Sequence, residues 1–160
     1  MNNIAVLATG RCLMSGKVRS FDSAVEELLN ESKSELHLLI YSFTELRVLR
    51  SLEKAVERGI KLKMIVNKQD RPDIKKRLQK MTKKSNCSII WFPATEYRQL
   101  HAKVLVGDRN IAIVGSANLS RRGMISNYEI GLLVSGKPAW ELAKSIDNLG
   151  NEIEENPAKI

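Results

Sequence analysis

Two β-prone runs that lie four residues apart constrain the fold of this chain most strongly. The runs are AKVLV (102–106) and IAIV (111–114), and Gly107-Asp108-Arg109-Asn110 separates them. Such residues between two apolar runs are typical of the tight turn in a β-hairpin. We therefore predict an antiparallel strand pair centred near Arg109, in which facing residues have numbers that sum to about 218.

The rest of the chain alternates short apolar runs with amphipathic segments. Strands are predicted at residues 4–8, 36–43, 61–66, 87–92 and 128–134. Between them we predict helices, because apolar residues recur there at helical spacing. Ser23 caps the first helix and Thr44 the second, Gly59 ends the second, a third covers 73–84, and the last starts near Pro138. This order predicts a single α/β domain over the whole chain, 1–160, with helices on both faces of a central mixed sheet.

Composition narrows the classes of protein to which the chain could belong. Its 160 residues suit one domain, and no apolar run approaches the roughly 18 residues of a membrane span. Cys12 and Cys87 are the only cysteines, which favours a reducing compartment, and we expect the cytoplasm. His37 and His101 are the only histidines, so we expect no multi-histidine metal site within one chain.

The formal net charge of +8 comes from one segment. Residues 61–84 contain ten Lys or Arg and two Asp, whereas basic and acidic residues balance elsewhere in the chain. A dense basic block on a neutral body indicates a polyanionic partner such as nucleic acid. A solvated helix face that aids solubility is the alternative interpretation. The candidate nucleic-acid-binding residues are Lys75, Lys76, Arg77, Lys80, Lys83 and Lys84.

Polar residues gather at the open end of the predicted hairpin. His101 and Lys103 share one face because they are two residues apart on a strand, and the register places Ser116 and Asn118 beside His101. This set suits a phosphodiester: Lys103 and Asn118 can bind its non-bridging oxygens, Ser116 can donate a further hydrogen bond, and His101 can attack phosphorus. Gly115 would let a ligand approach the backbone closely.

Two acidic residues and the second histidine need separate treatment. A straight strand puts Asp108 about 23 Å from His101, so we expect Asp108 to act at the turn or against a neighbouring segment. A histidine nucleophile needs a carboxylate to hold its tautomer, and Glu129 is the candidate, although it could equally be an ordinary charge at a strand end. His37 lies in a predicted buried strand, where a structural histidine is expected.

The spacing of these residues resembles a known motif. His101-x-Lys103, Asp108 and Gly115-Ser116-x-Asn118 together resemble the HKD motif of the phospholipase D superfamily. Segments outside the motif are similar to those of the small bacterial endonucleases in that superfamily. These segments are Tyr41-Ser42-Phe43-Thr44, Glu57–Lys63 and Asn127-Tyr128-Glu129. The resemblance covers roughly residues 20–135.

The resemblance implies an α/β/α sandwich with a central mixed sheet, and phosphodiester chemistry that needs no metal and no cofactor. It makes His101 the nucleophile, Lys103 the phosphate-binding residue and Glu129 the support of the histidine. Ser116 and Asn118 occupy the serine and asparagine positions of the family, and Asp108 is mainly structural. Family members use two motifs per active site, and this chain has one. The resemblance therefore implies a homodimer with a shared site.

Three functions remain open at this point. The basic block, the small size and the lack of a membrane-inserting segment favour a nuclease acting on DNA or RNA. A phospholipase or phosphatidyl-transferase would use the same mechanism, and a nucleic-acid-binding module could retain the motif without catalysis. The sequence does not distinguish DNA from RNA, and it leaves strandedness, sequence preference and biological role open.

Overall fold

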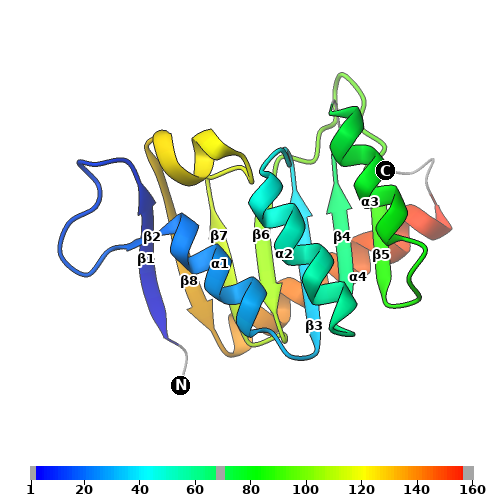
Figure 1. The fold of residues 1–160 in the computed structure, drawn as a ribbon, viewed down its shortest axis with the longest axis horizontal. Coiled ribbons are helices and arrows are strands. Elements are labelled where there is room, and N and C mark those ends of the chain that lie inside the picture. The colour runs from blue at the N-terminus through cyan, green and yellow to red at the C-terminus, as the bar shows by residue number, and fades with distance from the viewer. Residues whose placement is uncertain (1–2, 68–70, 157–160) are drawn as a thin grey trace.

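Eight strands form one mixed sheet in the order β2-β1-β8-β7-β6-β3-β4-β5 (Figure 1). The structure is a computed structural model that describes residues 3–67 and 71–156. The strands are β1 (Ile4–Thr9), β2 (Arg19–Ser20), β3 (Glu35–Ile40), β4 (Lys61–Val66), β5 (Cys87–Trp91), β6 (Lys103–Gly107), β7 (Ile111–Gly115) and β8 (Glu129–Ser135). The helices are α1 (Phe21–Glu31), α2 (Leu46–Glu57), α3 (Pro72–Met81), α4 (Lys137–Glu155) and the short π-helix η1 (Arg122–Ser126).

The predicted hairpin is present with the predicted register. In the antiparallel pair of β6 and β7, Val104 faces Val114. Three residues connect the strands, and the first two, Asp108 and Arg109, have positive φ angles of 51° and 52°. The Asn110 N–H donates to the Gly107 carbonyl oxygen at 3.0 Å, so Asp108 and Arg109 are the central residues of a type I′ turn. Strands β3, β4 and β5 run parallel, and β3 pairs antiparallel with β6. The predicted α/β class and mixed sheet are therefore confirmed.

Helices cover both faces of the sheet (Figure 1). α1, α2 and α3 lie on one face of the sheet, and α4 crosses the other face. The parallel β3–α2–β4–α3–β5 connections place α2 and α3 on the same face. Each face has its own apolar core. Leu38 and Leu49 belong to the core on the α1–α3 side, and Val106 and Ala143 belong to the core on the α4 side. The sandwich is thus built by burying both faces of the central strands.

The predicted start of α1 is wrong by about one turn. The helix begins at Phe21, and Ser20 rather than Ser23 is the N-cap: the Ser23 N–H donates a hydrogen bond to Ser20 Oγ at 3.1 Å. The earlier start adds Phe21 to the helix, and its side chain is buried in the core. Of the two serines that could cap the helix, the one that brings Phe21 into the core is therefore used.

The ends of the next two helices also differ from the prediction. Glu45 caps α2 in place of Thr44, whose N–H donates instead to the carbonyl oxygen of Leu119 at 2.8 Å. Gly59 follows α2 with a φ of 90°, as its predicted role in ending the helix requires. α3 ends at Met81, so residues 83 and 84 lie in the turn beyond the helix.

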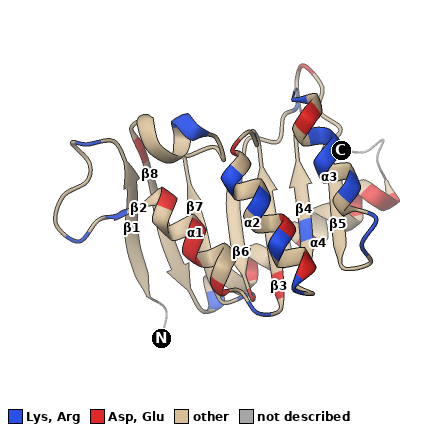
Figure 2. Ribbon diagram, in the orientation of Figure 1, with Lys and Arg blue, Asp and Glu red and all other residues tan. Residues whose placement is uncertain are grey.

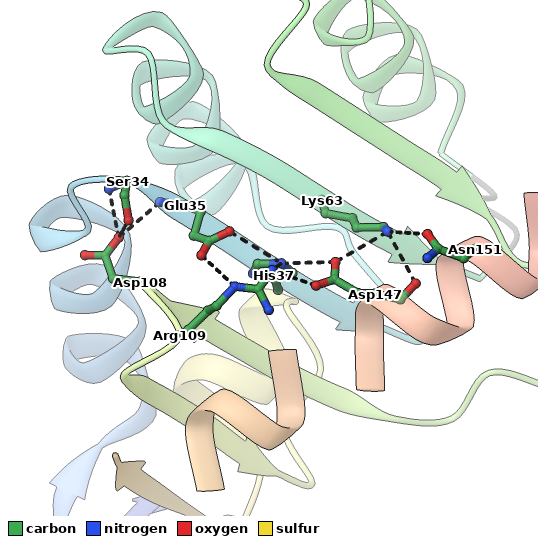
Figure 3. A network of polar contacts seen from close by, with 8 residues as sticks. All are labelled: Ser34, Glu35, His37, Lys63, Asp108, Arg109, Asp147 and Asn151. Carbon is green, nitrogen blue, oxygen red and sulfur yellow. Dashed lines mark hydrogen bonds and ion pairs between the residues drawn. The ribbon is translucent and has the colours of Figure 1, made fainter. Parts of the chain in front are cut away.

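A polar network joins the start of β3, the hairpin turn and α4 (Figure 3). His37 is only 3% exposed, and its Nε2 lies 3.3 Å from both the Arg109 guanidinium and the Asp147 carboxylate. Burial lowers the pKa of His37, and Asp147 opposes that shift in part. Arg109 also donates to Glu35 at 2.7 Å. This geometry supports the interpretation of His37 as a structural residue.

In the described part of the chain, no helix combines the length and the apolar composition that crossing a membrane requires.

Candidate active site

The motif residues meet at one edge of the sheet. Strands β3, β4 and β7 end at this edge, and β6 and β8 begin there. His101 lies two residues before β6 and is exposed, whereas Lys103 is the first residue of β6 and is 8% exposed. Antiparallel pairing of β6 with β7 brings residue 116 to the same edge, and pairing of β7 with β8 brings residue 129 there.

His101 and Lys103 are in direct contact. Lys103 Nζ lies 3.5 Å from His101 Nε2 and donates a hydrogen bond to the His101 carbonyl oxygen at 2.8 Å. Burial lowers the pKa of Lys103, and the Glu129 carboxylate opposes the shift in part. A cation with little water around it, next to an exposed imidazole, can bind an oxygen of a phosphate that the imidazole also reaches.

Tyr41 is also part of this site, and its only signal in the sequence was its place in the segment 41–44 that resembles the bacterial endonucleases. Its ring centroid is 4.8 Å from that of His101, and Lys103 Nζ lies 5.3 Å from the ring centre. The Tyr41 N–H donates to the Ala102 carbonyl at 3.1 Å. Tyr41 comes to lie beside His101 through the pairing of β3 with β6, which is a tertiary contact.

Ser116 and Glu129 form a pair beside the histidine and lysine. The Ser116 hydroxyl donates to the Glu129 carboxylate, and its oxygen accepts from the N–H of Ile130 at 3.2 Å. Asn127 Nδ2 donates to the other Glu129 oxygen at 3.0 Å. Among the described residues, Ser116 and Asn127 are the hydrogen-bond partners of Glu129, and His101 is not one of them. The expected support of the His101 tautomer by Glu129 therefore remains a proposal.

Asn118 lies in the connection from β7 to η1. Its backbone packs so closely on Gly123 that a Cβ there would lie 2.9 Å from Asn118 N. The next residue, Leu119, accepts hydrogen bonds from the N–H groups of Thr44 and Glu45 at 2.8 and 3.0 Å. Asn118 Oδ1 is enclosed and has no hydrogen-bond partner within the described ranges. The connection is thus fixed to the end of β3 at the same edge as His101.

Gly115 is explained by packing rather than by access for a ligand, which corrects the expectation from the sequence. A Cβ at this position would lie 2.6 Å from Phe21 Cζ and 2.9 Å from Gly131 Cα. The space that the glycine leaves open is therefore occupied by α1 and by β8. The residue lets α1 approach the sheet closely at Phe21.

Asp108 lies at the opposite edge of the sheet, in the turn after β6 (Figure 3). Its carboxylate accepts hydrogen bonds from the N–H groups of Lys33, Ser34 and Glu35 at 2.9, 2.8 and 3.0 Å. The Ser34 hydroxyl donates a fourth at 2.7 Å. Burial raises the pKa of Asp108, but these hydrogen bonds outweigh it and hold the pKa below its usual value. Asp108 therefore anchors the hairpin turn to the start of β3.

α3 carries most of the candidate binding residues of the basic block, and it lies beside β5 and away from β6 (Figure 2). α3 packs beside β5, and β5 is three strands from β6, or about 14 Å across the sheet. Arg77 donates to Glu53 at 2.9 Å, so its charge is already paired. Residues 68–70 of the basic block lie outside the described residues. The exposed members of the candidate binding set are Lys75, Lys76, Lys80, Lys83 and Lys84.

Within residues 3–67 and 71–156, no group of three or more His, Cys, Asp or Glu side chains is placed to hold a metal ion.

A family model described as cardiolipin synthase, PLD-like domain, matches residues 25–152. The chain belongs to the phospholipase D superfamily. Its fold, a mixed sheet between helices, is that of superfamily members, which act on phosphodiester bonds. The match includes every residue that the sequence placed in the candidate site.

Two curated proteins are similar to this phospholipase D-like chain. DISARM protein DrmC of Bacillus paralicheniformis is 27% identical over 141 residues, which cover 85% of this chain and 58% of that protein. Cardiolipin synthase B of Salmonella typhi is 31% identical over 115 residues, or 68% of this chain and 27% of the synthase. The chain therefore spans a little over half of the first relative and about a quarter of the second.

Three solved structures share the fold. Nuc of Salmonella typhimurium, a phospholipase D family member, has a TM-score of 0.73 at 17% identity, covering 94% of this chain and 95% of Nuc. NucT of Helicobacter pylori has a TM-score of 0.70 at 19% identity, covering 91% of this chain and 92% of NucT. TrmBL2, an archaeal chromatin protein, has a TM-score of 0.59 at 17% identity, covering 93% of this chain and 52% of TrmBL2. At these identities, the likeness concerns the fold alone.

Proposed function

We propose that this protein is a metal-independent endonuclease that cleaves DNA or RNA through a phospho-histidine intermediate, in a site shared by two copies of the chain. The observation that carries the proposal is the contact of Lys103 Nζ with His101 Nε2 at 3.5 Å on an exposed sheet edge. An imidazole nucleophile and a phosphate-binding cation are thereby held together. Nuc and NucT share this fold over almost their whole length, which supports the assignment.

The proposed reaction has two displacements at phosphorus. His101 attacks the scissile phosphate, a nitrogen–phosphorus bond forms, and the bond to the leaving oxygen breaks. Lys103 and Asn118 bind the non-bridging oxygens, where negative charge develops in the transition state. The Ser116 hydroxyl, which donates to Glu129 in the free protein, turns to donate its hydrogen bond to the phosphate. Water then displaces His101 and releases the phosphate end. The leaving oxygen needs a proton in the first step, so an acid must lie on the far side of the phosphate.

His37 is poorly placed to be that acid. It lies four residues from Tyr41 along β3, about 13 Å for an extended strand, and it is enclosed with Asp147 on the α4 side of the sheet. Histidine is the commonest general acid near neutral pH, and the other histidine of the chain is His101 itself. The acid in the proposed mechanism is therefore His101 of a second copy.

An exposed apolar face beside the site supports a dimer. Ile4 and Val6 on β1, and Ile130 and Leu132 on β8, are each at least 40% exposed. Val6 pairs with Leu132, and Ile130 pairs with Ala8, so the four side chains share one face of the sheet, on the side of α4. Contiguous exposed apolar surface marks interaction sites, and β8 begins at Glu129. A self-complementary contact here is the proposed dimer interface.

We expect cleavage of nucleic acid to persist in excess EDTA, because the proposed nucleophile and charge-stabilising groups are all side chains. The test incubates pure protein with single-stranded DNA, duplex DNA, RNA and phosphatidylcholine vesicles, each with and without EDTA. Loss of cleavage with the chelator, restored by Mg²⁺ or Zn²⁺, would contradict the phospho-histidine mechanism.

We expect the basic helix to contribute affinity rather than chemistry. Changing Lys76, Lys80 and Lys83 together to Gln should weaken binding and reduce the slope of log affinity against log salt by roughly 0.7–0.9 for each lysine–phosphate pair removed. Single-turnover cleavage at saturating protein should change little, because α3 lies beside β5 rather than β6.

The matched control for this prediction removes the same charge at the opposite edge of the sheet. Lys33 precedes β3, Lys61 begins β4 and Lys137 begins α4. Changing these three lysines together to Gln should leave the slope of log affinity against log salt unchanged. Equal slopes for the α3 variant and the wild type would show that α3 faces away from the substrate.

Two alternative functions each have one observation in their favour. Similarity to cardiolipin synthase B favours a phospholipase or phosphatidyl-transferase, and hydrolysis of phosphatidylcholine without cleavage of nucleic acid would establish it. The structure of TrmBL2, described as showing a novel mode of DNA binding, favours a non-catalytic nucleic-acid-binding module. Binding of DNA or RNA without cleavage of any substrate would establish that function.

A further inference from the structure

Two strongly exposed tyrosines flank the candidate active site. Tyr97 is 92% exposed and Tyr128 is 66% exposed. We propose that their rings stack against bases on either side of the scissile phosphate, which makes the substrate a single-stranded or locally unpaired nucleic acid. This inference rests on the proposed function and names the class of substrate for the same site.

The first tyrosine stands at the tip of a braced turn. The Thr95 N–H donates to the Arg98 carbonyl oxygen at 2.9 Å, and the Arg98 N–H donates to the Thr95 carbonyl oxygen at 3.4 Å. Tyr97 is therefore one of the two residues at the tip of this turn. Gln99 then fixes the turn, because its Oε1 accepts a hydrogen bond of 3.0 Å from the buried side chain of Asn67 at the end of β4. A large ring is therefore held out in solvent four residues before His101.

The second tyrosine is held in position by a glycine. Gly10 has a φ of 101°, and a Cβ there would lie 2.7 Å from Tyr128 Cδ1 and 3.0 Å from Cγ. The Tyr128 ring thus rests against the backbone of Gly10, at the end of β1, and still exposes two thirds of its surface. Tyr128 immediately precedes Glu129, so this ring stands on the β8 side of the site.

Three arginines lie close along the chain to Tyr128 or to the glycine beneath its ring. Arg11 follows the glycine under the ring, and Arg121 and Arg122 lie in the connection that leads to Tyr128. The Arg122 carbonyl accepts a hydrogen bond from Asn127 N at 2.7 Å, which folds this segment back towards the tyrosine. These three arginines are exposed and make no ion pair within the described part of the chain. They can bind the phosphates of a strand whose bases reach the ring.

The order of the strands places the two rings on opposite sides of His101. β8 is two strands from β6 in one direction, about 10 Å, and the connection that carries Tyr97 crosses from β5 to β6 on the other side. Aromatic side chains beside a basic track are the usual means of binding single strands, because every base has a face that can stack. In a duplex those faces are already stacked and paired, so the rings favour an unpaired strand.

The test measures binding of a fluorescent single-stranded 20-mer and of its duplex by anisotropy at fixed salt. The protein carries His101→Ala, so that the strand stays intact. We expect Tyr97→Leu and Tyr128→Leu each to weaken single-strand binding about 5- to 100-fold, the loss of one base stack, and to leave duplex binding unchanged. Tyr97→Phe and Tyr128→Phe should bind like the parent, because stacking uses the ring and not the hydroxyl.

The matched control is Trp140→Leu, which removes an exposed aromatic ring from the first turn of α4 at the opposite edge of the sheet, and single-strand binding should not change. Unchanged binding by both leucine variants, or equal losses on single strand and duplex, would overturn the inference. Loss of a dimer in Tyr128→Leu would also overturn it, since that ring would then contact the second copy. The proposed function fails separately, if the wild-type protein cleaves no nucleic acid at all.

Discussion

Replacing His101 by alanine should abolish turnover of nucleic acid and leave the protein folded. The imidazole supplies the proposed nucleophile, and the nitrogen base in contact with it, Lys103, is assigned to bind the phosphate oxygens. The side chain is exposed, so its removal opens no core cavity, and thermal unfolding should be close to that of the wild type. Residual activity well above background in His101→Ala would contradict the proposed role.

The same variant tests whether two copies share the site. Wild type and His101→Ala are co-refolded so that subunits mix at random, and exchange is verified with a size-tagged chain. If one His101 attacks and the other protonates the leaving oxygen, activity follows the square of the wild-type fraction, and an equal mixture keeps about a quarter of it. If each chain works alone, about half remains. A linear dependence with verified exchange would exclude the shared site.

Asp108→Ala should destabilise the fold strongly and leave the chemistry of folded molecules unchanged. The change removes the acceptor of three backbone N–H groups, those of Lys33, Ser34 and Glu35. Leaving such donors partly enclosed without a charged acceptor should lower the free energy of unfolding by roughly 2–4 kcal/mol. Denaturant titration measures this loss, and cleavage per folded molecule is measured well below the melting temperature.

Ser34→Ala is the matched control, because it removes only the hydroxyl bond to Asp108 and should cost about 1 kcal/mol. The pH dependence gives a second measurement. The pKa of Asp108 lies below its usual value in the folded protein, so its contribution is present above the unfolded pKa and is lost as the pH falls through the folded pKa. Asp108→Ala should lack this acid-range loss. A stable variant with impaired cleavage would instead place Asp108 in the chemistry.

Much of the architecture could be read from local patterns. The four residues between two β-prone runs predicted the hairpin and its register. Side chains alternate between the two faces of a strand, so few pairing registers remain once the turn is placed. The spacing of His101 and Lys103 predicted that both side chains share one face, and their contact follows from it. Gly59 ended its helix as predicted because only a residue that tolerates positive φ suits that position.

Features that depend on contacts between distant segments could not be predicted from the sequence. Ser20 caps α1 in place of Ser23, which adds Phe21 to the helix and buries it in the core. Thr44 donates its N–H to Leu119, and Glu45 caps α2 instead. Gly115 is required by the ring of Phe21, which no local pattern connects to it.

The candidate site divides in the same way between local sequence and tertiary structure. The sequence by itself determined which groups are proposed to act on phosphorus, because their chemistry and their spacing along two paired strands are local properties. Only the tertiary structure decided what surrounds them: Tyr41 against His101, Ser116 on Glu129, and His37 enclosed on the other face with Asp147. Strand order sets these neighbours, and strand order is selected by the burial of the whole sheet rather than by any one segment.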